Sequence, residues 1–530
     1  MKGEKKKMKK NFARVLSCAI ALVMAISMFG IVAVFAGDDT PVYDGTSISE
    51  SLQGEGTEAS PYLIQNGADL KYFEQNAAAT TGKFYKLTSD IVWSNYSEAA
   101  EAPAASNWTP VNFNGTFDGD GHTIYGLYIN TPDAKQIGFF GTASGTIKNL
   151  TLKDSAIIAG QYVGGFVGAA LIGTADAPTS LTIENCVNYV NVTATLKNTE
   201  VGGFIGQAFS TPKTDGGAMT ITITKCINYG SVNGTYNGTA YAGGIVGRLL
   251  GSNGSIISEC INYGKVTAAK AVAGGIVGQS SLANHTDYPA THSIVISDCL
   301  NAGDVTAQYI SAGIIGRAYG LTTIKNCVST GKIVATASDA TNSIRYNPID
   351  GGNGGAILAT HENNYYLAGS AVNTALPEAK PEITVEGAKT EAELNTANMA
   401  AALGEKWLYN TTDGLMLVAF ATAAPEVPGG DNTTVTPPEV TTKPVDDVTT
   451  QPADITTKPA DVTTTEPKDD DTTTVPVYHD TTTKAPVVTD APTSTDAPEK
   501  EKGCGGFAVA AQLIAVLGAA VAVVAVKKKI

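Results

Sequence analysis

The chain has 530 residues and is acidic, with 50 Asp and Glu against 35 Lys and Arg and a formal net charge of −15. Only 16% of its residues are charged, so most of its polar surface must come from uncharged side chains. An acidic chain without a basic stripe does not suit nucleic acid, because phosphate contacts need clustered Lys and Arg. The composition therefore excludes nucleic acid as a partner.

Residues 1–36 have the pattern of a secretory signal peptide. Several lysines between Lys2 and Lys10 precede an apolar run that extends from Val15 to Phe35. The small residue Ala36 then ends a plausible cleavage site. The alternative is an uncleaved N-terminal membrane anchor, and under both interpretations the chain that follows is exported.

Residues 37–130 are expected to form an N-terminal cap and the first coils of the fold. The segment from Gly67 to Ala79 has an amphipathic helical pattern, and Asn66 is a suitable N-cap residue. A cap is needed because the first coil would otherwise expose an unpaired strand edge and its apolar interior.

A glycine-flanked apolar phrase recurs through residues 131–370. Its last glycines lie 27, 38, 41, 31 and 38 residues apart, at Gly141, Gly168, Gly206, Gly247, Gly278 and Gly316. Such a period is typical of supersecondary units stacked into a solenoid. Residues 219–225 alternate apolar and polar side chains as a half-buried strand does, and such short strands must stack about 4.8 Å apart to bury their apolar faces. The predicted fold is all-β, a right-handed parallel β-helix with short helical caps.

Most repeats also contain the phrase Cys-x-Asn. The cysteines are Cys186, Cys226, Cys260, Cys299 and Cys327, and the asparagines are Asn188, Asn228, Asn262 and Asn301. We expect a buried column of thiols, because an odd number of cysteines does not suit a disulfide framework. One or two disulfides between stacked coils are the alternative. The asparagines are expected to stack at a corner and satisfy backbone groups, and no metal or other cofactor is predicted.

These repeats resemble those of the GLUG-motif surface proteins of Gram-positive bacteria. The resemblance rests on phrases such as Gly244–Gly247 and on three leading segments, 54–64, 84–91 and 113–127. It extends over residues 50–420. It implies a parallel β-helix displayed on the cell surface, and it implies much less about activity, because one fold hosts many functions.

The C-terminal third is predicted to close and anchor the solenoid. Residues 371–424 combine a helical pattern with apolar strands and are interpreted as a closing cap. Residues 425–502 are rich in Thr, Pro and Asp, which predicts a disordered stalk. Residues 503–530 contain a transmembrane helix, Phe507–Val526, and a basic tail that remains in the cytoplasm. The solenoid is therefore expected outside the cell, held in the plasma membrane by this one helix and without covalent attachment to the wall.

No catalytic constellation stands out, and the sequence predicts that the chain is not an enzyme. His361 and Glu362 begin a motif like that of zinc metalloproteases, but Tyr365 replaces its second histidine. Glu259 and Asp298 precede equivalent cysteines and would stand about 5 Å apart, which is the spacing of a retaining glycosidase pair. We interpret them as members of an ordinary solvated face.

Tyr189, Tyr229 and Tyr263 are the candidate ligand-binding residues. Each follows the corner asparagine of its repeat, so coil stacking should align the three rings in one column. Exposed rings could pack on sugar C–H surfaces, whereas stacked rings stabilise neighbouring coils by about 0.5 to 1.5 kcal/mol per pair beyond burial. The structural role is preferred, because Ala302 and Thr330 end the column.

Three functions fit the sequence. The preferred one is a non-enzymatic binding or adhesion module, displayed on a stalk toward glycans or toward host and neighbour-cell surface proteins. The alternative is a polysaccharide-active enzyme, which would require acids together with Arg or Lys on one face, and the sequence pattern does not show such a cluster. A passive structural component of the surface layer is the third.

Overall fold

The computed structural model describes residues 40–421, apart from the segments 80, 97–104, 172–178, 210–218, 251–253, 282–292, 319–321, 339–343, 353–358, 376–386 and 411–413. The predicted signal peptide (1–36), stalk (425–502) and transmembrane anchor (503–530) lie outside the described residues. Within the described part of the chain, no helix combines the length and hydrophobicity that a membrane crossing needs.

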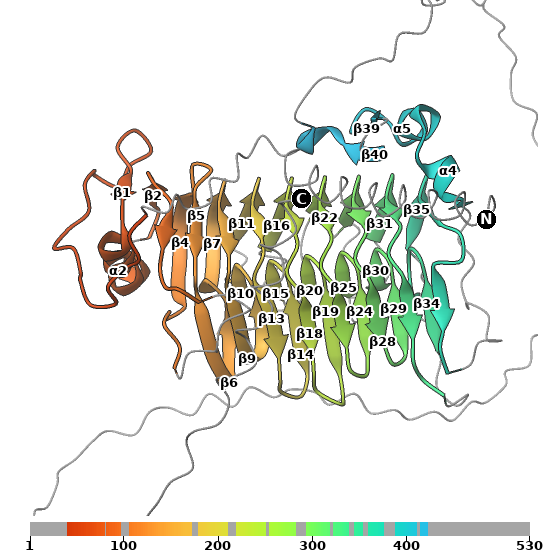
Figure 1. The fold of residues 1–530 in the computed structure, drawn as a ribbon, viewed down its shortest axis with the longest axis horizontal. Helices are drawn as coiled ribbons and strands as arrows, with labels where there is room; N and C mark the ends of the chain where they lie inside the picture. Colours follow the sequence, from red (N-terminus) through yellow and green to blue (C-terminus); the bar gives the residue numbers. More distant parts are fainter. Residues whose placement is uncertain are drawn as a thin grey trace, which may run out of the picture. The chain divides into compact units, whose positions relative to one another are not determined.

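The described chain consists mainly of short strands that stack coil by coil into three parallel sheets (Figure 1). Sheet 1 contains β1 (Tyr62–Ile64), β2 (Lys83–Leu87), β4 (Val111–Asp118), β7 (Phe140–Lys148), β10 (Val167–Ala170), β11 (Thr179–Glu184), β15 (Ile205–Phe209), β16 (Met219–Thr224), β20 (Val246–Leu250), β21 (Ser255–Ser258), β25 (Val277–Ser281), β26 (Ile294–Ser297), β30 (Ile315–Arg317), β31 (Thr322–Lys325) and β35 (Thr360–Glu362). Sheet 2 contains β3 (Ile91–Val92), β5 (Thr123–Tyr125), β8 (Thr151–Lys153), β12 (Val187–Asn188), β17 (Ile227–Asn228), β22 (Ile261–Asn262), β27 (Leu300–Asn301), β32 (Val328–Ser329), β36 (Tyr365–Leu367) and β38 (Ala388–Lys389). Sheet 3 contains β6 (Tyr128–Ile137), β9 (Ala156–Gly164), β13 (Asn191–Ala194), β14 (Thr199–Gly202), β18 (Val232–Gly234), β19 (Ala240–Gly243), β23 (Val266–Ala268), β24 (Val272–Gly274), β28 (Val305–Ala307), β29 (Ile310–Ala312), β33 (Ile333–Ala335), β34 (Arg345–Asn347) and β37 (Ala371–Asn373). The predicted all-β parallel β-helix is confirmed, and its right-handed sense stays a prediction.

Successive coils are aligned residue over residue. In sheet 1, Ile223 pairs with Ile183 on one side and with Ile257 on the other. In sheet 3, Val192 pairs with Val232. All of these side chains belong to one continuous buried core. The alternation in the strands explains this arrangement, because every second side chain points inward and meets its equivalent from the next coil.

Two long strands divide the stack into parallel branches. The first half of β7 pairs with β10 and its second half pairs with β11. In the same way, β9 pairs with both β13 and β14. Each later coil therefore replaces one long strand by two shorter ones, and sheets 1 and 3 each continue as two stacks.

The predicted asparagine column is present and lies inside the protein. The amide nitrogen of Asn188 donates to Oδ1 of Asn228 over 2.7 Å. The same bond joins Asn228 to Asn262 over 2.8 Å and Asn262 to Asn301 over 2.9 Å. All four residues are fully buried. Because each amide also donates to the backbone of its own turn, the ladder satisfies buried polar groups while it ties the coils together.

The five repeat cysteines form the predicted buried column. All five are fully buried and none is in a disulfide. Each thiol donates to a backbone oxygen one coil away, as Cys226 does to Ile183 over 3.6 Å. Burial raises the pKa of the Cys226 and Cys299 thiols well above the usual range, so these groups remain neutral and pack as small apolar side chains.

The N-terminal helix forms where the sequence predicts it. It comprises α2 (Gly67–Asn76) and a following 3-10 turn (Ala77–Ala79). Oδ1 of Asn66 caps α2 by accepting two backbone N–H groups, over 2.9 and 3.1 Å. On the inner face of the helix, the ring of Phe73 lies 5.9 Å from that of Phe113. The helix thereby covers the apolar interior of the first coils.

The C-terminal segment covers a side of the solenoid. It contains α4 (Glu391–Leu394), α5 (Ala397–Leu403), the antiparallel strands β39 (Trp407–Asn410) and β40 (Gly414–Leu417), and a 3-10 turn (Val418–Phe420). Its apolar side chains pack on an outer stripe of sheet 2 formed by Ile227, Ile261, Leu300 and Val328. In Figure 1 the segment lies along the upper edge, beside β22 and β31.

The interpretation of residues 371–424 as a closing cap stays a prediction. Two strands of this segment continue the sheets, because β37 pairs with β33 in sheet 3 and β38 pairs with β36 in sheet 2. The described residues from Glu391 onward lie along the side of sheet 2, because an apolar stripe that runs over four coils would otherwise face water.

The glycine pairs of the repeat are required by space, which predicts their mutational sensitivity. A Cβ atom at Gly244 would lie 2.1 Å from the carbonyl oxygen of Gly275 and 2.4 Å from Cγ of Asn262. We expect Gly244→Val and Gly275→Val each to lower the free energy of unfolding by about 3 kcal/mol or more, because overpacking forces the coils apart. Chemical denaturation of the full-length chain measures this.

Gly234→Ala is the matched control. Its Cβ would approach no closer than 3.3 Å to Ala240, and the adjacent coil has Ala268 at the equivalent position. The spatial explanation is wrong if the Gly244→Val and Gly275→Val variants unfold at the same denaturant concentration as the control.

Candidate functional site

The three candidate tyrosines form one stacked column on the outside of sheet 2. The ring centroids of Tyr189 and Tyr229 lie 4.6 Å apart, with 7° between their planes. Those of Tyr229 and Tyr263 lie 5.1 Å apart, with 13° between their planes. Tyr189 is 36% exposed and Tyr263 is 43% exposed. Because the rings stack on one another, most of their faces are covered by the neighbouring ring. The column therefore presents mainly ring edges and hydroxyl groups to solvent.

The column continues toward the N-terminus through a residue that the sequence analysis did not include. The ammonium group of Lys153 lies 5.8 Å from the ring centroids of both Tyr125 and Tyr189. It therefore bridges two aromatic rings as a cation between π faces. Burial raises the pKa of Tyr229 well above its usual range, so its phenol remains neutral. This geometry favours a brace between coils.

A buried ion pair lies at a second place, where two strand stacks meet. We call the contact line between the β14–β19–β24–β29–β34 stack of sheet 3 and the β15–β20–β25–β30 stack of sheet 1 the seam. Nη1 of Arg248 donates to Oε1 of Glu200 over 3.0 Å, and the guanidinium carbon lies 4.8 Å from the Tyr241 ring centroid. The Glu200 side chain is only 4% exposed, against 24% for Arg248.

The carboxyl of Glu200 is electrostatically unusual. Burial raises its pKa to about 7, although Arg248 acts in the opposite direction. Its Oε2 atom has no hydrogen-bond partner among the described residues. A carboxyl group with this pKa can accept or release a proton near neutral pH. Glu200 does not stand out in the sequence, because it precedes the glycine phrase as a single acid with no second acid nearby in the chain.

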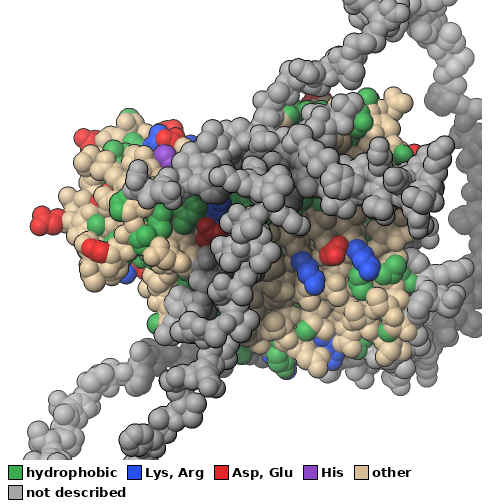
Figure 2. All heavy atoms as spheres, viewed as in Figure 1, with side chains coloured by type: hydrophobic (Ala, Val, Ile, Leu, Met, Phe, Trp, Pro, Cys, Tyr) green, Lys and Arg blue, Asp and Glu red, His purple; other side chains and the backbone are tan. Residues whose placement is uncertain are grey.

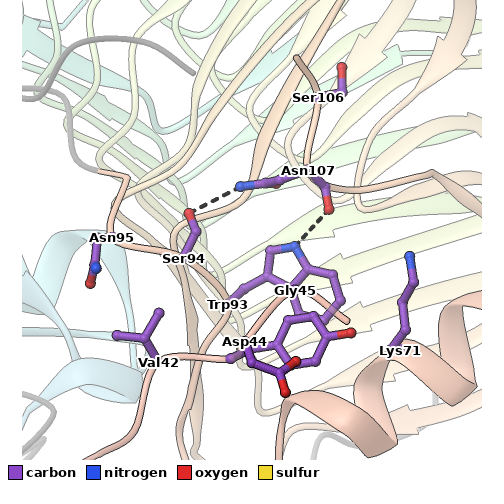
Figure 3. A pocket seen from close by; sticks show the side chains of 10 residues that line it. Val42, Asp44, Gly45, Lys71, Trp93, Ser94, Asn95, Ser106 and Asn107 are labelled. Carbon is purple, nitrogen blue, oxygen red and sulfur yellow. Dashed lines mark hydrogen bonds between the residues drawn. The ribbon is translucent and has the colours of Figure 1, made fainter. Parts of the chain in front are cut away.

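The N-terminal region contains a pocket of about 480 Å³ (Figure 3). The rings of Tyr43 and Trp93, which line it, stack 4.5 Å apart. Trp93 donates from Nε1 to the backbone oxygen of Asn107 over 2.9 Å. A hydrogen bond from the Ser47 hydroxyl contributes most to lowering the pKa of Asp44, also in the lining, to about 2.

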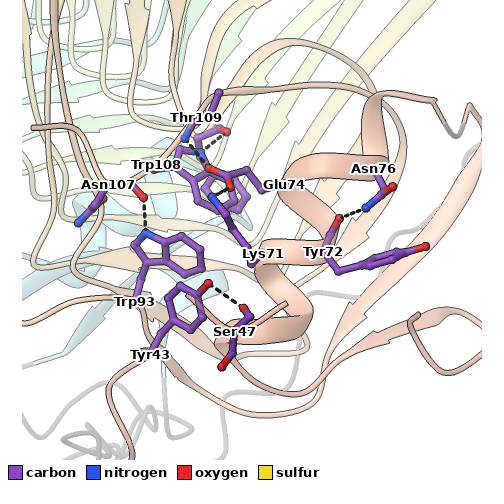
Figure 4. Close-up of polar contacts among 11 residues, drawn as sticks. Tyr43, Ser47, Lys71, Tyr72, Glu74, Asn76, Trp93, Asn107, Trp108 and Thr109 are labelled. Atoms are coloured by element: carbon purple, nitrogen blue, oxygen red, sulfur yellow. Dashed lines mark hydrogen bonds and ion pairs between the residues drawn. The ribbon is translucent and has the colours of Figure 1, made fainter. Parts of the chain in front are cut away.

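Figure 4 shows how the polar groups beside this pocket are engaged. Lys71 pairs with Glu74 on α2, and Glu74 also accepts the backbone N–H of Thr109 over 2.6 Å. The Tyr43 hydroxyl donates to the backbone oxygen of Ser47 over 2.8 Å. These contacts join α2 to the first coils, so they brace the N-terminal region.

The acids weighed as catalytic candidates have structural partners. Glu259 and Asp298 both have a φ of 53°, and each forms the left-handed turn ahead of its cysteine. Glu259 also pairs with Lys406 of the C-terminal segment over 3.3 Å. His361 lies on β35 and pairs with Asp350 over 3.2 Å.

Two protein relatives share part of the sequence. Halomucin from Haloquadratum walsbyi is 32% identical over 172 residues, which are 31% of this chain and 2% of that protein. A protein of Evansella cellulosilytica, provisionally named a Gly-rich membrane protein, is 32% identical over 127 residues, which are 23% of this chain and 13% of that protein. The chain thus spans only a small part of the length of both relatives. No family model matches it.

Two solved structures are similar in fold. One is provisionally named an immunoglobulin A1 protease from Bacteroides ovatus, with 21% identity, a TM-score of 0.43, and coverage of 69% of this chain and 94% of that chain. The other is named IgA1 protease, with 15% identity, a TM-score of 0.40, and coverage of 64% of this chain and 24% of that chain.

These structures contradict the prediction that the chain is not an enzyme, because both are named for a protease. That prediction is withdrawn. At 21% and 15% identity the likeness concerns the fold alone, so no residue of this chain receives a protease role from it.

The raised pKa of Glu200 predicts how stability depends on pH. Its folded pKa of about 7 exceeds the ordinary value of 4.5, so the folded protein binds this proton more tightly than the unfolded chain does. The stabilisation is fully present below about pH 4.5 and is lost as the pH rises through 7, by about 3 kcal/mol in total. Glu200→Gln removes this dependence.

Urea denaturation of the full-length chain at pH 5 and pH 8 measures the effect. Glu184→Gln is the matched control, because Glu184 is 43% exposed and its removal changes the net charge equally. Equal pH dependence in wild type and Glu200→Gln would contradict the expected proton uptake.

Proposed function

We propose that this chain is a GLUG-type β-solenoid of a Gram-positive cell surface that binds extended glycans. Residues 503–530 would hold it in the plasma membrane, with residues 425–502 as a stalk. One relative is named for a membrane and another is named halomucin, and both names support a surface location. Host or neighbour-cell surface proteins are the competing partners.

The observation that carries this proposal is the repetition of neutral hydrogen-bonding groups along the outer face of sheet 3. Thr193, Asn233, Thr267 and Thr306 are register neighbours in four successive coils. All four are partly exposed. The column therefore offers a hydroxyl or an amide about every 4.8 Å. Figure 2 shows that the described part of the viewed face carries few charged side chains.

Such a surface fits a polymer better than a compact partner. A glycan chain also repeats its hydroxyl groups along one axis, so many weak contacts can form in parallel, and their sum gives useful affinity. A folded protein partner would meet this flat, uncharged strip without the aromatic and arginine anchors that dominate protein interfaces.

Retention of the full-length chain on glycan-coated beads tests the proposal. We expect cells that display the wild-type chain to be retained on beads coated with at least one polysaccharide. Cells that lack the chain should not be retained. A chain that is retained by no glycan but binds a purified surface protein would contradict glycan binding. A chain that binds neither would be a passive component of the surface layer.

The tyrosine column should stabilise the coils without being the binding surface. Tyr229→Ala combined with Tyr263→Ala removes both stacked pairs, which should lower the free energy of unfolding by about 1 to 3 kcal/mol and leave glycan retention of the folded protein unchanged. Tyr236→Ala, which lies outside the column, is the control. Unchanged melting temperature together with lost retention would instead assign the column to binding.

A further inference from the structure

Arginine is scarce in this chain, and three of its four copies converge on the seam. The four are Arg14, Arg248, Arg317 and Arg345, whereas all other basic residues are lysines. Arg248 and Arg317 both follow the last glycine of the repeated phrase. The register pairs Arg248 with Gln279 and Gln279 with Arg317, so the three form one column of the β20–β25–β30 stack.

The third arginine lies across the seam. Arg345 pairs with Ile310 in the register of sheet 3. Ile310 continues the column that begins with Glu200 and Tyr241. The backbones of the two stacks are in direct contact here, because a Cβ at Gly247 would lie 2.6 Å from the backbone nitrogen of Val201. Arg248 and Arg317 are separated by two coil rises, about 9.6 Å.

The polar groups of the seam are held in place and are not fully satisfied. The Arg248 guanidinium is fixed by Glu200 and by the Tyr241 ring, yet its Nε has no hydrogen-bond partner among the described residues. The Oε1 atom of Gln279, a residue only 2% exposed, also has none within that part of the chain. The Gln279 amide is too deeply buried to meet a ligand, whereas the Arg248 side chain is 24% exposed and can donate to a ligand that supplies an acceptor.

We propose that the seam binds an acidic polysaccharide, with carboxylate or sulfate groups on Arg248 and Arg317. The inference rests on the proposed function and specifies its glycan. Arginine suits this role better than lysine, because its planar fork bonds an oxyanion through two parallel N–H groups. The rest of the chain is acidic, so a polyanion gains attraction mainly at this line of arginines.

Binding of the full-length chain to polygalacturonate, dextran sulfate and neutral dextran tests the assignment. Glu200→Gln combined with Arg248→Gln removes the ion pair without changing the net charge. Arg317→Gln is compared with Lys332→Gln, which removes the same charge from an exposed position of the solenoid. If the double variant melts early, Arg248→Lys keeps the contact to Glu200 while it loses the fork.

We expect retention on one acidic polymer to exceed retention on dextran, and both the double variant and Arg317→Gln to weaken it at least tenfold while Lys332→Gln does not. Preference for polygalacturonate identifies carboxylate, and preference for dextran sulfate identifies sulfate. Equal losses in Arg317→Gln and Lys332→Gln would overturn the seam assignment. If the chain is retained on neutral glycans and the seam variants are retained equally well, the seam assignment is overturned while the proposed glycan binding stands. If the chain is retained on no glycan, the seam assignment and the proposed function are both overturned.

Discussion

The fold depends on one constraint, which is that each coil lies over the previous one in the same register at a rise of about 4.8 Å. The buried asparagine ladder makes this register specific, because an amide can donate to the next amide and to its own turn only when equivalent residues coincide. Gly244 reinforces the constraint, since it approaches the carbonyl oxygen of Gly275 in the next coil too closely for any side chain. A shift of one residue would turn every core side chain outward and break the ladder at once.

The same register decides which side chains can act together. Residues far apart in the sequence become neighbours whenever they occupy the same place in the repeat. For Tyr189, Tyr229 and Tyr263 the outcome is a stack whose faces are largely used internally. For Arg248 and Arg317 it is a pair of cations two coils apart, with Gln279 on the coil between them, beside a contact line that already buries an acid. Repetition thus yields a brace in one column and a candidate binding line in another.

Much of this architecture could be predicted from the sequence, because residues at equivalent positions of the repeat stack into columns. The asparagine ladder, the thiol column and the capped helix at Asn66 follow from residues that recur or from local chemistry. The seam could not be predicted in the same way, because the alternation in a strand does not reveal that the outer faces of two strands will meet. One sequence pattern does indicate the arginine column. Glutamine and arginine alternate at the position after the last glycine of the repeated phrase, at Gln207, Arg248, Gln279 and Arg317. The packing of the C-terminal segment along sheet 2 could not be predicted for a related reason, since Ile227 and Ile261 face outward beside the inward asparagines and form an apolar stripe that needs a cover.

Disulfide trapping tests the coil register most directly. Thr267 and Thr306 are register partners on the partly exposed face of sheet 3. The pair Thr267→Cys and Thr306→Cys should form a disulfide under mild oxidation, because parallel neighbours lie about 4.8 Å apart, within the Cα range of a disulfide. The pair Thr267→Cys and Asp304→Cys is displaced by two residues, which places its Cα atoms about 8 Å apart and out of range. Peptide mapping without reduction should find the first bond and not the second, and a displaced pair that forms as readily as the aligned one would contradict the register on which the fold and both columns depend.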